Sequence, residues 1–245
     1  MVYITGDIHS EIYPRFSNKS FLEQKTLTKD DYAIILGDFG IPWDKSKEDQ
    51  YKLKELESRP FTTLFIDGNH ENYDLLEQFP VKEWHGGSVH QVSEHVLHLM
   101  RGQVFDIDGK TFFTFGGARS HDIQDGILDG MGPNWKKQAK HMVRQGKSCF
   151  RVSHVSWWDR ETASEEEMQT GLANLEAHGF SVDYVLTHTL PARIAKAISV
   201  EDPVATYLDT VLEKTAFRKW YFGHMHTDAE ISRDMQAMYE TIARI

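Results

Sequence analysis

The sequence is poor in cysteine, and Cys149 is the only one in the chain. A single thiol excludes an intrachain disulfide, fits a reducing compartment, and leaves metal ligation to nitrogen and oxygen donors. The chain also has no apolar run of about 20 residues that would span a bilayer. Its first residues, MVYITGD, lack the basic stretch and apolar segment of a secretory signal. We therefore expect a cytoplasmic protein without a membrane partner.

Positive charge is also scarce, because 27 Lys and Arg face 37 Asp and Glu, a formal net charge of −10. This balance disfavours tight binding to a nucleic-acid backbone, although a local basic or metal site would override it. Hydrophobic residues (40%) and charged residues (26%) stand at values typical of globular proteins. We expect one domain over residues 1–245, and the composition does not indicate an oligomeric state.

Short apolar runs alternate with polar helical stretches in the first half of the chain, the pattern of a sheet covered by helices. It predicts strands at 2–5, 31–36 and 62–66 and a crossover helix over 45–58. Asp108-Gly109, between strands predicted at 104–107 and 111–115, is a strong hairpin signal, and a second layer of antiparallel strands is expected to begin there. Residues 120–160, which are Gly-rich and polar, are interpreted as an insertion or lid over the site.

The second half contains fewer clear signals. A helix is predicted near 135–144, and another from Thr162 or Ser164 to about His178, where a glutamate three residues after either cap would complete a capping box. Further strands are predicted at 183–186, 218–222, 229–232 and 235–242. Thirteen histidines against one cysteine direct attention to imidazole clusters.

Five of the predicted strands each end in a carboxylate, amide or imidazole side chain. In open α/β sheets ligands bind beyond the carboxyl ends of the strands, so these ends are expected to converge. In an extended Asp-x-His or His-x-His segment, both side chains lie on one side and grip one region. The neighbouring glycines would permit the tight reversal of the chain over each strand end. The segments are GDIH (6–9), GDFG (37–40), GNHE (68–71), TH (187–188) and GHMH (223–226).

This ordered set of motifs, from residue 6 to residue 226, resembles that of the calcineurin-like metallophosphoesterases. Each motif alone is short enough to arise by chance, and five in the family's order are specific. The resemblance implies an α/β fold in which two mixed sheets pack as a sandwich flanked by helices. It also implies one metal held by Asp7, His9 and His226, a second held by Asn69, His188 and His224, and Asp38 as the bridge between them.

The donor types agree with this assignment. Carboxylate, amide and imidazole ligands without thiolate suit divalent manganese, iron or zinc, and we expect manganese or iron. Two metals about 4 Å apart bind a shared hydroxide and clamp the attacking and departing oxygens of an in-line phosphoryl displacement. The expected activity is therefore hydrolysis of phosphomonoesters or phosphodiesters. His70 matches the family residue that protonates the leaving group, whereas Glu71 is interpreted as a carboxylate at a helix N-terminus.

The second motif departs from that of the protein Ser/Thr phosphatases, in which an aspartate and a phosphate-gripping arginine follow. Here Asp38 is followed by Phe39-Gly40-Ile41-Pro42, so the bidentate arginine clamp is missing at its place. A phosphoprotein substrate is therefore disfavoured. We interpret Arg119 as a substitute for that arginine and His121 as a further residue facing the substrate.

Two alternatives stand beside this interpretation. A nuclease or nucleotide phosphodiesterase would use the same metal core with a groove for its substrate, and the acidic net charge counts against a long nucleic acid. A non-catalytic scaffold would keep the fold and use the pocket for binding only. The aspartates beside glycine are, taken singly, ordinary turn residues, so the metal-site interpretation depends on the motifs occurring together.

Overall fold

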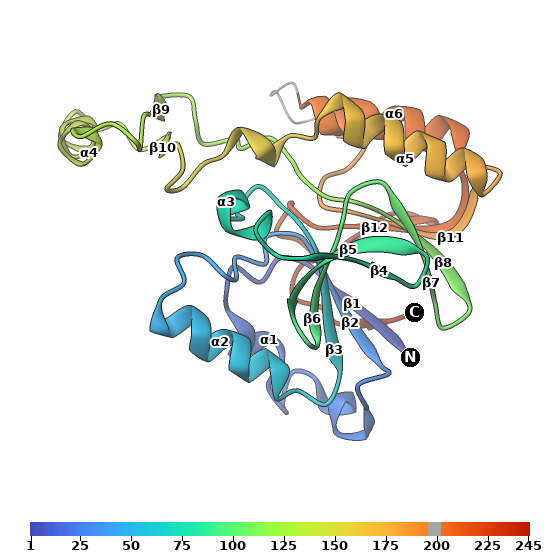
Figure 1. Cartoon of the computed structure of the whole chain (residues 1–245). Coiled ribbons are helices and arrows are strands. Elements are labelled where there is room, and N and C mark those ends of the chain that lie inside the picture. Colours follow the sequence, from blue (N-terminus) through green and yellow to red (C-terminus); the bar gives the residue numbers. More distant parts are fainter. Residues whose placement is uncertain (196–201) are drawn as a thin grey trace.

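The computed structural model describes residues 1–195 and 202–245, and it confirms the predicted α/β fold with two mixed sheets (Figure 1). The first sheet has seven strands in the order β15-β1-β2-β3-β6-β5-β4. Four neighbouring strands run parallel: β1 (Val2–Thr5), β2 (Tyr32–Leu36), β3 (Thr62–Ile66) and β6 (Val96–Leu99). The others pair antiparallel at the two edges: β15 (Ala243–Arg244), β5 (Gly87–Ser93) and β4 (Val81–Trp84).

The second sheet has six strands in the order β13-β14-β12-β11-β8-β7, and its arrangement corrects the expectation of an antiparallel layer. The central strands β8 (Lys110–Phe115), β11 (Ser181–Thr187), β12 (Ala216–Phe222) and β14 (Met235–Ala237) are parallel. Only the edge strands β7 (Gln103–Ile107) and β13 (Ala229–Ser232) pair antiparallel. The physical reason is that helices connect β8 to β11 and β11 to β12, and such crossovers produce parallel neighbours.

The hairpin between β7 and β8 forms as the sequence predicts. Ile107 pairs with Lys110, so Asp108 and Gly109 are the two loop residues. Both lie in the left-handed region, with φ of 56° and 71°. A type I′ turn needs positive φ at both positions, which is why Asp-Gly favours it.

The two sheets pack face to face, and side chains that alternate along the strands separate the layers. Ile4, Ile34 and Leu64 of the first sheet meet Phe112 and Leu186 of the second in one buried cluster. Side chains on the other face of the first sheet, such as Tyr3, Ile35 and Phe65, lie in another cluster beneath α1 (Ile12–Arg15) and α2 (Lys47–Glu57). The central strands are therefore apolar throughout because both of their faces are buried.

Helices α5 (Glu165–Ala177) and α6 (Pro203–Lys214) cover the outer face of the second sheet (Figure 1). Leu175 of α5 and Leu208 of α6 pack there with Val185 and Trp220. Ser164 caps α5 in the predicted capping box, because its hydroxyl accepts from the Glu167 amide and the Glu167 carboxylate accepts from the Ser164 amide. A short helix, α3 (Tyr73–Leu76), follows β3.

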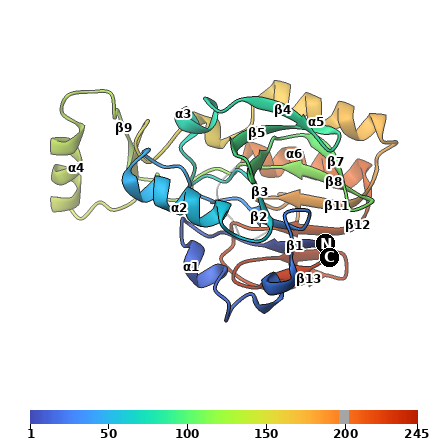
Figure 2. The same cartoon turned by 60° about the horizontal axis from the view of Figure 1, so that its bottom comes forward.

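Residues 120–160, which we call the arm, extend away from the sandwich between two ends, near Ser120 and Trp158, that are packed in the body (Figures 1 and 2). The arm contains a two-stranded parallel pair, β9 (Gly126–Leu128) and β10 (Phe150–Val152), and the helix α4 (Trp135–Arg144). None of the residues of α4 is buried. The two chain ends lie side by side, because β15 pairs with β1 (Figure 2). Within the described residues, the helices are too short or too polar to cross a bilayer.

Candidate metal centre

The ends of five strands bring the predicted site residues to one edge of the sandwich. β1, β2 and β3 are neighbours in the first sheet, and β11 and β12 are neighbours in the second. β1, β2 and β3 run parallel to one another, as do β11 and β12, so their carboxyl ends point the same way within each sheet. The loops that follow them contain the seven predicted ligands: Asp7, His9, Asp38, Asn69, His188, His224 and His226.

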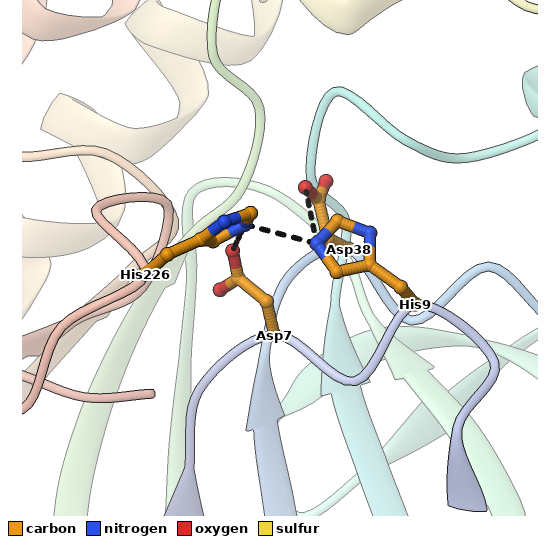
Figure 3. A group of neighbouring side chains, drawn as sticks. All are labelled: Asp7, His9, Asp38 and His226. Carbon is orange, nitrogen blue, oxygen red and sulfur yellow. Dashed lines mark hydrogen bonds and ion pairs between the residues drawn. The ribbon is translucent and has the colours of Figure 1, made fainter. Parts of the chain in front are cut away.

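One group of donors consists of Asp7, His9, Asp38 and His226, whose ligand atoms all lie within 4.8 Å of one another (Figure 3). Nε2 of His9 lies 3.0 Å from Nε2 of His226 and 3.8 Å from Oδ2 of Asp38. Nε2 of His226 lies 3.2 Å from Oδ2 of Asp7. Donor atoms from three distant loops thus point at one small region, as ligands around a cation do.

A second group lies on the other side of Asp38. Nε2 of the fully buried His188 is 3.3 Å from Oδ1 of Asp38 and 3.2 Å from Oδ1 of Asn69. The Nδ1–H of His188 donates to the Leu36 carbonyl at 2.8 Å, which fixes Nε2 as the nitrogen that faces the carboxylate. Asp38 therefore presents one oxygen to each group of donors.

His224 joins the two groups. Its backbone N–H contacts both oxygens of Asp7, at 3.0 and 3.2 Å, and its ring lies 4.9 Å from that of His188. Nε2 of His224 is 2.8 Å from Nε2 of His121. The structure thus brings His121 to the cluster, and its role toward the substrate stays a prediction.

The buried carboxylates of the site need a compensating positive charge. Asp7 and Asp38 are both 1% exposed, and a buried carboxylate is costly unless a positive partner compensates it. Burial alone would lower the pKa of His188, but the charge of Asp38, its hydrogen bond and the charge of Asp7 outweigh that and raise this pKa to about 10. A proton on His188 thus compensates the carboxylates.

A divalent cation between the same atoms would supply that charge and release the proton. The donor set fits such an ion, because oxygens and imidazole nitrogens converge without thiolates. His224 suits this role as well. Burial, followed by the neighbouring His188, holds the pKa of His224 well below its usual range, so that its ring is neutral as a ligand must be.

The loops achieve this convergence through left-handed backbone at the ligands themselves. His9, Asp38, His224 and His226 have φ between 44° and 64°. Residues other than glycine rarely adopt this region, and when they do they concentrate at functional sites. The reversal expected of the neighbouring glycines is thus made in large part by the ligand residues.

The glycines have a different use, which the sequence did not reveal. A Cβ atom on Gly68 would lie 2.1 Å from Oδ1 of Asp38, and one on Gly223 would lie 2.3 Å from Oδ1 of Asp7. Neither residue has a positive φ. Glycine is needed at both positions because the carboxylates pack directly against the backbone.

Glu71 differs from its sequence interpretation. The structure places it just before Asn72, which is the residue that caps α3 with its own side chain. The buried Glu71 carboxylate instead accepts hydrogen bonds from the backbone amides of Phe39 (2.7 Å) and Gly40 (3.0 Å). It therefore fixes the loop that presents Asp38, and burial together with the Asp38 charge raises its pKa.

Asn69 is oriented by a buried pair that sequence reasoning missed. Its amide nitrogen donates to Ser120 Oγ at 3.4 Å, and Ser120 donates to Glu161 at 2.6 Å from Oγ and 2.9 Å from its amide. This chain turns Oδ1 of Asn69 toward His188. Ser120 and Glu161 are 41 positions apart, so no local spacing marks them.

The remaining predicted residues lie at different places. His70 follows Asn69, its amide donates to Oδ1 of Asp38 at 2.7 Å, and its ring lies 5.1 Å from that of His9. Its Nε2 contacts Arg151 of β10, a residue that the motifs did not indicate.

Arg119 is half-buried, and its backbone amide donates to Asp202, the cap of α6. Its role toward the substrate stays a prediction.

Comparisons with known proteins find distant similarities. The lariat debranching enzyme A of Xenopus laevis is 25% identical over 143 residues, which cover 52% of this chain and 26% of that protein. The alignment thus spans about a quarter of the relative's length. The crystal structure of the phosphopantetheinyl hydrolase from Mycobacterium tuberculosis matches 97% of this chain and 87% of that chain, with 14% identity and a TM-score of 0.44. No family model matches the sequence.

The ordered motifs resemble those of the calcineurin-like metallophosphoesterases, and the chain shows distant homology to the lariat debranching enzyme, which is a protein of that family. The chain's cluster of aspartates and histidines is a candidate metal site.

Proposed function

We propose that the chain is a dinuclear metal-dependent hydrolase of phosphomonoesters or phosphodiesters. The observation that supports this most is the position of Asp38, whose Oδ1 faces His188 and whose Oδ2 faces His9. A carboxylate shared between two donor groups is suited to bridge two cations. We assign one cation to Asp7, His9 and His226 and the other to Asn69, His188 and His224, with manganese or iron expected and zinc as the alternative.

Two cations held there would supply the Lewis acidity and the activated nucleophile of an in-line phosphoryl displacement. The protein's own contribution is to hold the ligands without rearrangement. His188 is fixed through Leu36, Asn69 through Ser120, and the Asp38 loop through Glu71. Such supporting hydrogen bonds set ligand orientation and geometry.

The proposal is tested by assaying manganese-loaded protein on p-nitrophenyl phosphate, bis(p-nitrophenyl) phosphate and single-stranded DNA. We expect turnover of at least one small ester that chelation abolishes and added manganese restores. If metal is bound and none of the three is hydrolysed, the non-catalytic scaffold is the better description.

One observation favours the rival nuclease or nucleotide phosphodiesterase. Six of the chain's 27 Lys and Arg residues lie between positions 130 and 158 of the arm, and none of its 37 Asp and Glu residues does. A basic arm on an acidic protein is the kind of local patch that attracts a polyanion. Hydrolysis of single-stranded DNA in preference to the small diester, with a steep loss on adding salt, would favour this rival.

We further propose that His70 is the general acid that protonates the leaving group. An arginine can only donate, so the contact of 3.2 Å from Arg151 makes Nε2 of His70 an acceptor and places its proton on Nδ1. Burial holds the pKa of His70 below its usual value, and the charge of Arg151 acts in the same direction against that of Asp38. Substrate phosphate would draw Arg151 away and add negative charge near the ring, and both changes favour the protonated form.

The variant His70→Ala tests this role through leaving-group dependence. We expect a loss in kcat of about 100-fold for an alkyl phosphoester, because its alkoxide needs a proton, and a much smaller loss for the p-nitrophenyl ester. The measurement is kcat for both esters at equal metal content. Equal losses for the two esters would show that His70 does not donate the proton.

A further inference from the structure

The arm delivers one side chain to the candidate metal centre. Arg151 lies on β10, and NH2 of its guanidinium is 3.2 Å from Nε2 of His70, 81 positions earlier in the sequence. The base of the arm is held against the body by a second contact, between His154 and Asp74 at 2.9 Å. The position of Arg151 is therefore set from both the arm and the body.

Asp122 holds the guanidinium in a fixed orientation. Nε of Arg151 donates to Oδ1 of Asp122 at 2.9 Å, and NH2 lies 2.7 Å from Oδ2. This is a two-point contact, which constrains the plane of the group as well as its position. The Arg151 side chain is 19% exposed, so most of its surface is packed against the protein.

The guanidinium keeps donors for a ligand. It has five N–H groups, and its contacts with the described residues involve Nε and NH2 only. Within residues 1–195 and 202–245, NH1 has no hydrogen-bond partner from the protein. NH1, and the N–H that now meets His70, are available to an anion beside the metal centre.

Arg151 lies close enough to the candidate metal ligands to contact a phosphoester bound there. His70 is bonded through its amide to Asp38 and its ring lies 5.1 Å from that of His9, so Arg151 stands one side chain away from the ligands. The segment after Asp38, where the protein Ser/Thr phosphatases have a phosphate-gripping arginine, contains none. We propose that Arg151 binds the non-bridging oxygens of the substrate's phosphoryl group and that Asp122 is its positioning residue.

This inference rests on the proposed function, and its test separates the two. The variants are Arg151→Met and the conservative Arg151→Lys, with Arg218→Met as matched control, because Arg218 is an exposed arginine on β12, outside the arm. For each protein, manganese content, KM and kcat for p-nitrophenyl phosphate, and the dissociation constant of inorganic phosphate by calorimetry are measured.

We expect Arg151→Met to weaken the binding of inorganic phosphate about 10- to 100-fold and to raise KM to a similar extent, because a charge-assisted contact is lost. Manganese content stays unchanged, Arg151→Lys recovers part of the affinity, and Arg218→Met behaves as the parent protein. Asp122→Asn, which removes the carboxylate that orients the guanidinium, weakens the binding of phosphate less than Arg151→Met does.

An unchanged phosphate dissociation constant in Arg151→Met overturns the inference, even if turnover falls, because the residue would then act only on the arm or on His70. If Arg151→Met does not fold, the other two variants decide. The inference is overturned if Arg151→Lys binds inorganic phosphate as tightly as the parent protein and Asp122→Asn leaves that affinity unchanged. If the parent protein binds manganese and phosphate but hydrolyses no ester, the proposed function fails, and the phosphate affinities still decide the role of Arg151.

Discussion

Asp38→Asn is expected to lower kcat by about 1000-fold or more, the scale on which removal of a group that stabilises charge in the transition state acts. Asp38 faces a different donor group with each of its two oxygens. Asparagine keeps the shape but supplies one oxygen, and it replaces the other with an NH₂ group that a cation repels. We expect fewer than two manganese ions per chain in the variant.

The control for this prediction is Asp106→Asn, because Asp106 is an exposed carboxylate on β7. It should leave kcat and manganese content as they are in the parent protein. Thermal unfolding of each variant checks that the fold is intact. Unaltered turnover in Asp38→Asn would contradict the bridging role.

Arg101→Met is expected to lower the free energy of unfolding by about 3–5 kcal/mol, because it leaves a buried charge without its partner. Asp67 and Arg101 are 1% and 3% exposed, and Nε and NH2 of the arginine lie 2.8 and 2.6 Å from Oδ2 of the aspartate. The Tyr73 hydroxyl lies 2.9 Å from the same oxygen and 2.6 Å from the Gly68 carbonyl oxygen, and its single proton can be donated to either. The network therefore also supports the loop that carries Asn69.

Urea denaturation measures this loss, with Arg218→Met, an exposed arginine on β12, as the matched control. In the double variant Asp67→Asn with Arg101→Met the buried charge is gone, so part of the stability should return. A loss in Arg101→Met no larger than that in Arg218→Met would mean that the buried pair is energetically unimportant.

The same pair predicts how the stability depends on pH. Burial would raise the pKa of Asp67, but Arg101 and His98 outweigh it and hold this pKa far below the ordinary value of 3.8. The folded state thus binds the proton more weakly than the unfolded state, so the contribution is complete above about pH 4 and declines as the pH falls below that value. Asp67→Asn with Arg101→Met should flatten the acid limb of the stability curve.

The sequence predicted the parts of the fold that depend on local pattern. The strands β1, β2, β3, β8, β11 and β12 and the Asp108-Gly109 hairpin lie where they were expected, because burial on both faces and a turn with two positive φ values leave clear signals. The buried strand β6 and its neighbour β5 were missed. Helix α6 was missed, although Asp202 before Pro203 is a recognisable start signal. Strand β4 was missed because its residues, VKEW, are exposed or half-buried and lack an apolar run.

For the site, the motifs predicted which side chains meet but not what holds them. The seven candidate ligands lie together, and their function as metal ligands stays a prediction. The supporting contacts of Ser120 with Glu161, and of Arg151 with His70, join residues 41 and 81 positions apart. Such pairs follow from the packing of the arm's base against the sandwich, and no spacing within one segment encodes them.

Anomalous scattering from crystals grown with manganese tests the central claim most directly. The account predicts two peaks about 4 Å apart, one on each side of Asp38, the first beside His9 and the second beside His188. A single peak, or none within coordination distance of the Asp38 carboxylate, would contradict a dinuclear centre.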